Sequence, residues 1–207
     1  MIDLLQPDTF RMNAEMIANA NKAVFSFVLR ACELNDARIC AALGINAELR
    51  DFLALQRLGS INLNSEASNV SVFVPAFGTK DMLDAVNENR SETVIETLEK
   101  QLDISSSYQS YTSVLSTLSE INRKLLNVWA DVASSQDPLA GILLGCKPEF
   151  LKMIPTLPRA QFLTALQNHQ LPIFKLRFSD FPTWKAICTN GFEDPLTQRE
   201  LLKTLVA

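Results

Sequence analysis

Six polar and basic side chains in the second half of the chain have types and spacings suited to contact with nucleic acid or with a protein partner. They are Lys152, Arg159, Gln161, Thr164, Lys175 and Arg177. Lys and Arg neutralise phosphates, while Arg, Gln and Thr can hydrogen-bond to base edges. Two other interpretations stay open, because such residues on a helix are often only solvated, and because Arg177 could instead pair with Asp180.

The chain offers little to a catalytic or metal-binding site. It lacks the glycine-rich phosphate loops and the Gly-x-Ser-x-Gly nucleophile pattern, and its one histidine is His169. The four cysteines include no Cys-x-x-Cys pair, which favours reduced, buried thiols over metal ligands. Only Cys146, between Gly145 and an expected helix start, has a position that could lower a thiol pKa. We therefore expect no catalytic residue, no metal site and no cofactor.

Net charge limits how the chain could bind DNA. With 19 Lys and Arg against 23 Asp and Glu, the formal charge is −4. A protein that binds duplex DNA alone usually presents a basic face, since neutralising phosphates supplies much of the affinity. A partner is therefore expected to make most phosphate contacts. If this chain contacts DNA directly, five basic residues should converge on its surface: Arg57, Lys152, Arg159, Lys175 and Arg177.

Composition indicates an ordinary globular protein. Of the 207 residues, 47% are hydrophobic and 20% charged, which suits one large or two small domains. No apolar run approaches the roughly 20 residues that span a bilayer. The opening Met1-Ile2-Asp3-Leu4 also lacks a basic leader region. We expect a cytoplasmic protein with no membrane segment.

Two short helices and an extended segment should position the six candidates. Pro148 begins one helix, residues 155–158 end it, and a second helix runs from Pro158 to about Asn168. Alternating apolar and basic residues from Leu171 to Phe178 predict an extended segment. The first two elements resemble a helix–turn–helix unit that would carry Arg159 and its neighbours outward.

A looser copy of this half lies 101 residues earlier in the chain. The offset pairs Asn21 with Asn122 and Gly44 with Gly145, and it also aligns seven pairs of apolar residues, such as Val24 with Leu125. Long helices are predicted over residues 12–33 and 111–133, each followed by an Asp that could cap a short helix ending at Leu-Gly. A local slip of one residue further matches Leu55 to Leu157 and Arg57 to Arg159.

The repeat predicts two structural halves. The first spans residues 1–104 and ends in a helix over residues 80–103. A serine-rich linker follows at residues 105–110. The second spans residues 111–207 and ends in a helix from Pro195 to Val206.

The second half resembles a known family at several positions. The shared residues are Ile121-Asn122, Asp137, Leu144-Gly145, Leu157-Pro158-x-x-Gln161, Gln170-Leu171 and Arg177-Phe178. Over about sixty residues they are similar to the D subunit of the bacterial flagellar master transcription activator (FlhD-like) and its relatives in conjugative elements. The first half keeps Asn21, Asp36, Leu43-Gly44 and Phe77 but lacks the Leu-Pro turn and the Arg before its last Phe.

The resemblance implies an all-α fold in which two FlhD-like repeats form a pseudo-two-fold, intertwined helical domain with short extended segments. It also implies a non-catalytic transcription regulator that acts on promoter DNA with a zinc-containing, FlhC-like subunit and recruits RNA polymerase. Such a chain would be a family dimer fused into one polypeptide, and it could still form homo-oligomers.

A second hypothesis is a helical adaptor or assembly protein that kept this fold without binding nucleic acid. The acidic charge and the weaker first copy favour it, and fold alone does not decide function. The five basic residues discriminate between the hypotheses, because they should scatter over the surface of an adaptor.

Overall fold

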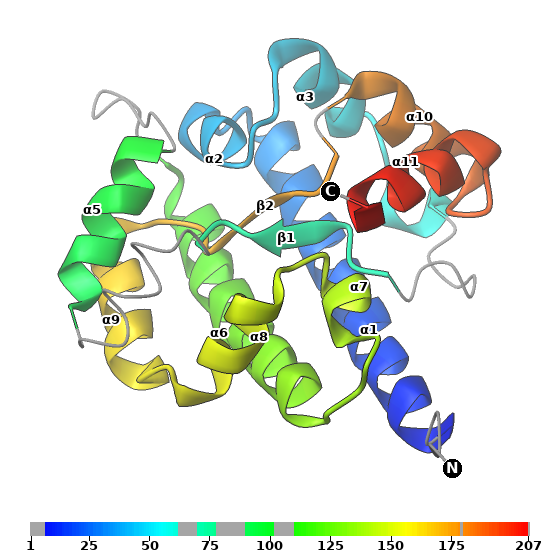
Figure 1. Ribbon diagram of the computed structural model, residues 1–207. Helices are drawn as coiled ribbons and strands as arrows, with labels where there is room; N and C mark the ends of the chain where they lie inside the picture. The colour runs from blue at the N-terminus through cyan, green and yellow to red at the C-terminus, as the bar shows by residue number, and fades with distance from the viewer. Residues whose placement is uncertain (1–6, 62–69, 78–89, 102–109, 179, 207) are drawn as a thin grey trace.

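Two long helices form the centre of the fold. The computed structural model describes residues 7–61, 70–77, 90–101, 110–178 and 180–206. Helix α1 spans Pro7–Glu33 and α6 spans Thr112–Ser134, close to the predicted ranges except that α1 begins before Met12. Neither helix has a Gly or an internal Pro, and each carries a continuous buried apolar face. These two helices contact each other more extensively than any other pair of described elements (Figure 1).

Similar series of short elements follow the two long helices. The first half contains α2 (Ala37–Ala42), α3 (Ala47–Ala54), η1 (Leu58–Ser60), β1 (Phe73–Pro75) and α5 (Ser91–Gln101). The second contains α7 (Ala140–Leu144), α8 (Pro148–Met153), η3 (Ile154–Thr156), α9 (Arg159–His169), β2 (Phe174–Leu176), α10 (Phe181–Asn190) and α11 (Pro195–Val206). The predicted all-α class with short extended segments is confirmed. None of the described helices combines the length and apolar character needed to cross a bilayer.

The two short helices after α1 and α6 begin differently. Asp36 caps α2 as predicted, because its Oδ1 accepts a hydrogen bond of 3.0 Å from the Ile39 N–H. Asp137 does not cap α7 in this way. Its Oδ1 accepts from the Leu139 N–H at 2.8 Å, only two residues on, and Leu139 itself precedes the helix. The carboxylate therefore forms a local turn, which delays the start of α7.

Strands β1 and β2 pair antiparallel across the middle of the molecule (Figure 1). Phe73 lies opposite Leu176, Val74 opposite Lys175, and Pro75 opposite Phe174. Just outside the strands, the Ala76 N–H donates to the Ile173 carbonyl at 2.8 Å, and the Arg177 N–H donates to the Val72 carbonyl at 2.9 Å. The donors of these two bonds, Ala76 and Arg177, are 101 positions apart, and so are the acceptors, Val72 and Ile173. The halves thus contribute equivalent residues to one reciprocal pairing.

One buried asparagine ties β1 to the long helix of its own half. The side-chain amide of Asn21 donates to the Val70 carbonyl at 2.9 Å, and its Oδ1 accepts from the Val72 N–H at 3.1 Å. Asn21 has an exposed fraction of 0%. Because unpaired polar groups are costly in such a site, these two bonds fix the chain entering β1 against α1.

Asn122 makes the same contacts in the second half. Its amide donates to the Leu171 carbonyl at 2.8 Å, and its Oδ1 accepts from the Ile173 N–H at 3.2 Å. We call the contacts of Asn21 and Asn122 the asparagine clamps. Both clamps join an asparagine to backbone groups 49 and 51 residues further on. The predicted equivalence of the two asparagines therefore corresponds to equivalent hydrogen bonds.

The helices that follow each strand pack on the opposite half. Trp184 of α10 lies edge-on to Phe25 of α1, with ring centroids 5.4 Å apart. In the other direction, α5 packs beside α9, where Glu99 and His169 approach to 2.9 Å. Figure 1 shows α5 and α9 at one end of the strand pair and α3, α10 and α11 at the other. The two halves are therefore intertwined around β1 and β2.

The boundary between the predicted halves is only partly described. The helix expected over residues 80–103 is seen as α5 from Ser91 to Gln101, whereas residues 78–89 and 102–109 lie outside the described residues. Most of the predicted linker falls there. Its last residue, Ser110, donates from Oγ to Asp36 Oδ1 at 3.0 Å. One hydrophobic cluster includes buried residues of both halves.

The asparagine clamps predict a large effect of a small substitution. Asn21→Ala or Asn122→Ala should lower the free energy of unfolding by about 2–4 kcal/mol, because each leaves two buried backbone groups without their partner. Urea unfolding followed by circular dichroism measures this loss. The matched control is Asn168→Ala on the exposed face of α9, which should stay within about 0.5 kcal/mol of the parent. Equal effects at all three positions would contradict the clamp assignment.

Candidate functional site

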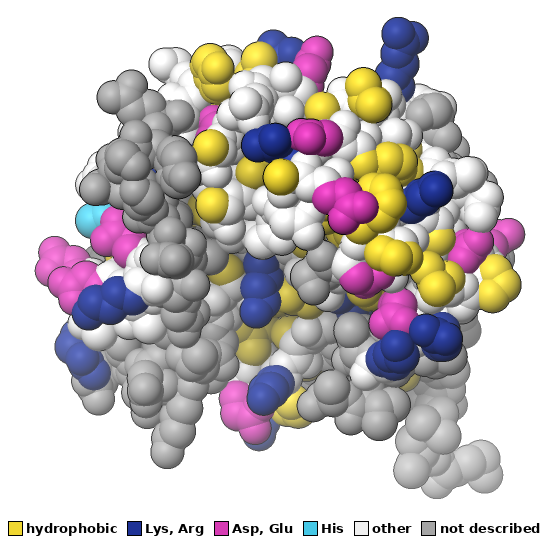
Figure 2. Space-filling view, turned by 90° about the horizontal axis from the view of Figure 1, so that it is seen from above, with side chains coloured by type: hydrophobic (Ala, Val, Ile, Leu, Met, Phe, Trp, Pro, Cys, Tyr) yellow, Lys and Arg dark blue, Asp and Glu magenta, His cyan; other side chains and the backbone are white. Residues whose placement is uncertain are grey.

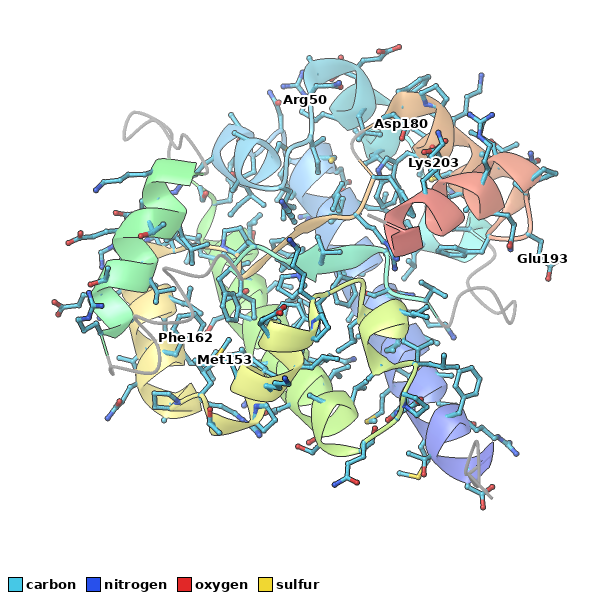
Figure 3. All side chains as sticks on the ribbon, viewed as in Figure 1. Arg50, Met153, Phe162, Asp180, Glu193 and Lys203 are labelled. Atoms are coloured by element: carbon cyan, nitrogen blue, oxygen red, sulfur yellow. The ribbon has the colours of Figure 1, made fainter. Side chains whose placement is uncertain are left out.

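The predicted helix–turn–helix unit consists of α8, η3 and α9. Its inward side is apolar: Met153 and Phe162, both labelled in Figure 3, point into the interior and are 5% and 0% exposed. The Phe162 ring lies 5.1 Å from that of Phe77, and Phe150 lies 5.7 Å from Trp129 of α6. The core thus holds both short helices firmly and leaves their opposite sides for solvent or a partner.

The α9 candidates divide into exposed and anchored side chains. Gln161 and Thr164 are exposed, although the Thr164 Oγ1 also donates to the Ala160 carbonyl at 3.0 Å. Arg159 is half-buried, and its Nη1 donates to Asn127 Oδ1 on α6 at 3.3 Å. Gln161 and Thr164 are therefore the α9 candidates most available to a partner.

The two lysine candidates project from separate elements. Lys152 is exposed on α8, and Lys175 is exposed on β2 opposite Val74. Lys175 thus occupies the middle of the reciprocal strand pairing, whereas Lys152 belongs to the unit that carries α9.

Arg177 turns into the fold. Its Nη1 donates to the Ser71 carbonyl at 3.2 Å, across 106 residues of sequence. Its guanidinium also lies over Gly145: a Cβ built on that glycine would be only 3.0 Å from the Arg177 Cζ. Burial lowers the pKa of Arg177 to about 10, so the side chain stays charged at neutral pH. Arg177 thereby joins the end of β2 to the start of β1, and Asp180 caps α10 through the Thr183 N–H.

The five basic residues occupy different surroundings. Arg57 lies in the first half, beside a groove on α1, while Arg159 contacts α6 and Arg177 packs against Gly145. On the face seen in Figure 2, Lys and Arg side chains lie among Asp and Glu instead of gathering in one region. These placements put Arg57, Arg159 and Arg177 in three separate surroundings.

The cysteines have distinct environments. Cys32 and Cys40 are buried, and the hydrogen bond between them raises the pKa of Cys32 and lowers that of Cys40. Burial raises the pKa of Cys146 to about 12, which is opposite to the shift that an activated thiol needs. Within the described ranges, no three His, Cys, Asp or Glu side chains come together as a metal site.

Two surface hollows were not predicted from the sequence. One, of about 240 Å³, lies between α6 and α9 and is lined partly by Ser116, Ser119 and Gln167. The other, of about 510 Å³, lies between α1 and residues 54–58. The absence of the Leu-Pro turn from the first half was the available signal for the second hollow. No family model, curated protein or solved structure matches the chain.

The two glycines at equivalent turns should respond differently to a methyl group. Both have a positive φ, 74° at Gly44 and 63° at Gly145, so alanine costs about 1–2 kcal/mol at either. A Cβ at Gly145 would also lie 3.0 Å from both Val74 and Arg177, whereas one at Gly44 meets nothing within 4 Å. Gly145→Ala should lower the free energy of unfolding by about 2–5 kcal/mol. Equal losses in chemical denaturation would show that Arg177 does not pack on this turn.

Proposed function

We propose that this chain is a single-chain counterpart of an intertwined D-subunit dimer and acts as a non-catalytic transcription regulator. It needs a zinc-containing partner subunit to act on promoter DNA, and the complex recruits RNA polymerase. This role is proposed from the resemblance of the second half to the flagellar activator family. The pairing of the two halves and the positions of the basic residues support how the chain would perform it.

The observation that best supports this proposal is the reciprocal joining of the halves. Residues 101 positions apart exchange places in the strand pairing, and each half has its own asparagine clamp. The helices after each strand then cover the other half. A dimer of a half-length protein, fused into one chain, has this arrangement because each former subunit still exchanges the same elements.

The proposed need for a partner rests on charge and on the position of the basic residues. The chain carries a formal charge of −4, and Arg177 lies against Ser71 and Gly145. The chain therefore contributes exposed polar side chains, chiefly Gln161 and Thr164 with Lys152 nearby in sequence. The partner supplies most of the phosphate neutralisation that DNA affinity requires.

The helical adaptor is the second candidate. One observation favours it: Arg57, Arg159 and Arg177 have separate surroundings, and Arg177 contributes to packing. Under this alternative the same outward surface of α8 and α9 contacts only protein.

DNA affinity distinguishes the two functions. At physiological salt, the isolated chain should bind promoter duplex no more tightly than about 1 µM, the tight end of non-specific binding. With the zinc-containing regulator recovered from its host, affinity should reach the nanomolar range typical of specific complexes. Fluorescence anisotropy measures both.

Substitutions then test whether α9 takes part. The double variant Gln161→Ala/Thr164→Ala should weaken promoter binding by the complex at least about tenfold, since a base contact contributes about 1–3 kcal/mol. Asn168→Ala, exposed on the same helix, is the control. Nanomolar specific binding by the isolated chain would refute the partner requirement, whereas a stable native complex that never binds DNA would support the adaptor.

A further inference from the structure

Two cysteines of the first half lie in contact where α1 meets α2. Cys32 belongs to the last turn of α1, and Cys40 belongs to α2. Their exposed fractions are only 2% and 3%, and a thiol–thiol hydrogen bond joins the two side chains. Cys146 and Cys188 lie more than 100 positions later in the chain, and burial is the main cause that shifts the pKa of either. Cys32 and Cys40 are therefore neighbouring sulfur groups, which we call the thiol pair.

A tight turn between the two helices produces this contact. Asn35 has a positive φ of 52°, and its N–H donates to the Cys32 carbonyl at 3.0 Å. The next N–H, of Asp36, donates to the Ala31 carbonyl at 2.9 Å, which completes a common helix-ending motif. Asp36 then caps α2, so the second helix starts at once and packs against the first. The thiol pair thus follows from the local backbone between the two helices.

The second half has no thiol at either matching position. The offset of 101 pairs Cys32 with Ala133 and Cys40 with Gly141. The turn that follows α6 likewise contains a residue with a positive φ, Gln136 at 56°. A buried cysteine often serves only as a small apolar side chain, but Ala and Gly meet that need in the second half. A turn at this place does not require sulfur, so the thiol pair is available for sulfur chemistry.

The hydrogen bond gives the two sulfur atoms different reactivity. Its donation by Cys32 is the largest cause that lowers the pKa of Cys40, and Arg50 acts in the same direction, against burial and Asp36. The same bond is the largest cause that raises the pKa of Cys32. The thiolate, not the thiol, is the nucleophile in sulfur chemistry. Cys40 is therefore the attacking sulfur, and Cys32 is a second thiol placed to react with the product that forms on Cys40.

We propose that peroxide oxidises the thiol pair to an intramolecular disulfide. The Cys40 thiolate attacks one oxygen of hydrogen peroxide, the O–O bond breaks, and Cys40 becomes a sulfenic acid. The hydroxide that leaves takes up the proton that Cys40 had released. The Cys32 sulfur then attacks the Cys40 sulfur, the S–O bond breaks, and water leaves with the Cys32 proton. In total, the two thiols lose two electrons and two protons, and one peroxide is reduced to two waters.

Access to the thiol pair depends on brief opening of α2. This helix has only six residues, and helices of that length have little stability of their own in water. Short elements held by few contacts open locally far more often than a whole domain unfolds. Hydrogen peroxide is little larger than water, so a small displacement of α2 admits it. This inference concerns the turn after α1 and does not depend on a role in transcription.

Tryptic peptides report the disulfide directly. Trypsin cuts after Arg38, between Cys32 and Cys40, so the two cysteines fall on separate peptides. The folded, full-length chain is treated with excess hydrogen peroxide, alkylated in denaturant, digested without reductant and examined by mass spectrometry. The two peptides should appear linked, and dithiothreitol should separate them by thiol–disulfide exchange.

The other two thiols serve as internal controls. Linkage should be at least about tenfold faster than oxidation of Cys146 or Cys188, because burial raises the pKa of both to about 12. Cys188→Ala is the matched control, since Cys188 is also buried, at 6% exposure, and this variant should link like the parent chain. Cys32→Ala should stop linkage and let dimedone trap the sulfenic acid on Cys40. Cys40→Ala should stop linkage and leave Cys32 as a thiol.

Three results would overturn the proposal. Complete alkylation of Cys32 and Cys40 after peroxide treatment would show that the pair does not oxidise. Oxidation of all four cysteines at similar rates would show no preference for this pair. Dimedone on Cys32 in the Cys40→Ala variant, with none on Cys40 in the Cys32→Ala variant, would refute Cys40 as the attacking sulfur. If a variant alters the circular dichroism spectrum, the linked peptides of the parent chain decide alone.

Discussion

The fold depends on satisfying two buried asparagine side chains. Each asparagine is buried, at 0% and 3% exposure, so its amide needs both a donor and an acceptor within the protein. Asn21 and Asn122 find them in the backbone just before β1 and β2. Because both ends of each amide are used, the strand cannot slide along the helix. The position of each strand then determines where the following helices reach the opposite half.

Local patterns in the sequence predicted much of this fold. The long helices follow from apolar spacing that repeats every three or four residues, and the equivalence of Asn21 and Asn122 follows from the offset of 101. Contacts between distant residues could not be predicted in the same way. Arg177 looked like a surface cation because its neighbours alternate, but its direction depends on Ser71, 106 residues away, and on Gly145. Asp137 likewise matched Asp36 in sequence yet bonded to a nearer backbone group.

The candidate site also has some features that local sequence patterns predicted and others that depend on contacts between distant residues. Exposure of Gln161 and Thr164 followed from the helical period of α9, because Phe162 and Leu166 take its inward positions. The groove on α1 depends instead on how the chain turns after α3. Leu157, which follows η3, is buried, whereas Leu55, which follows α3, is exposed. The two similar segments therefore differ in tertiary packing. The surfaces on which the halves differ are therefore the places where their roles can differ.

The exchange of helices between halves also constrains synthesis of the protein. Phe25 and Phe52 leave the ribosome early, but the rings that cover them belong to Trp184 and Phe181, with centroids 5.4 and 5.2 Å away. Those residues come more than 120 positions later in the chain. The first half therefore cannot complete its core until residues 181–184 have been made, and its aromatic side chains lack these partners until then. Contacts of such long sequence separation also slow folding, so the core of the first half forms late in the folding of the whole chain.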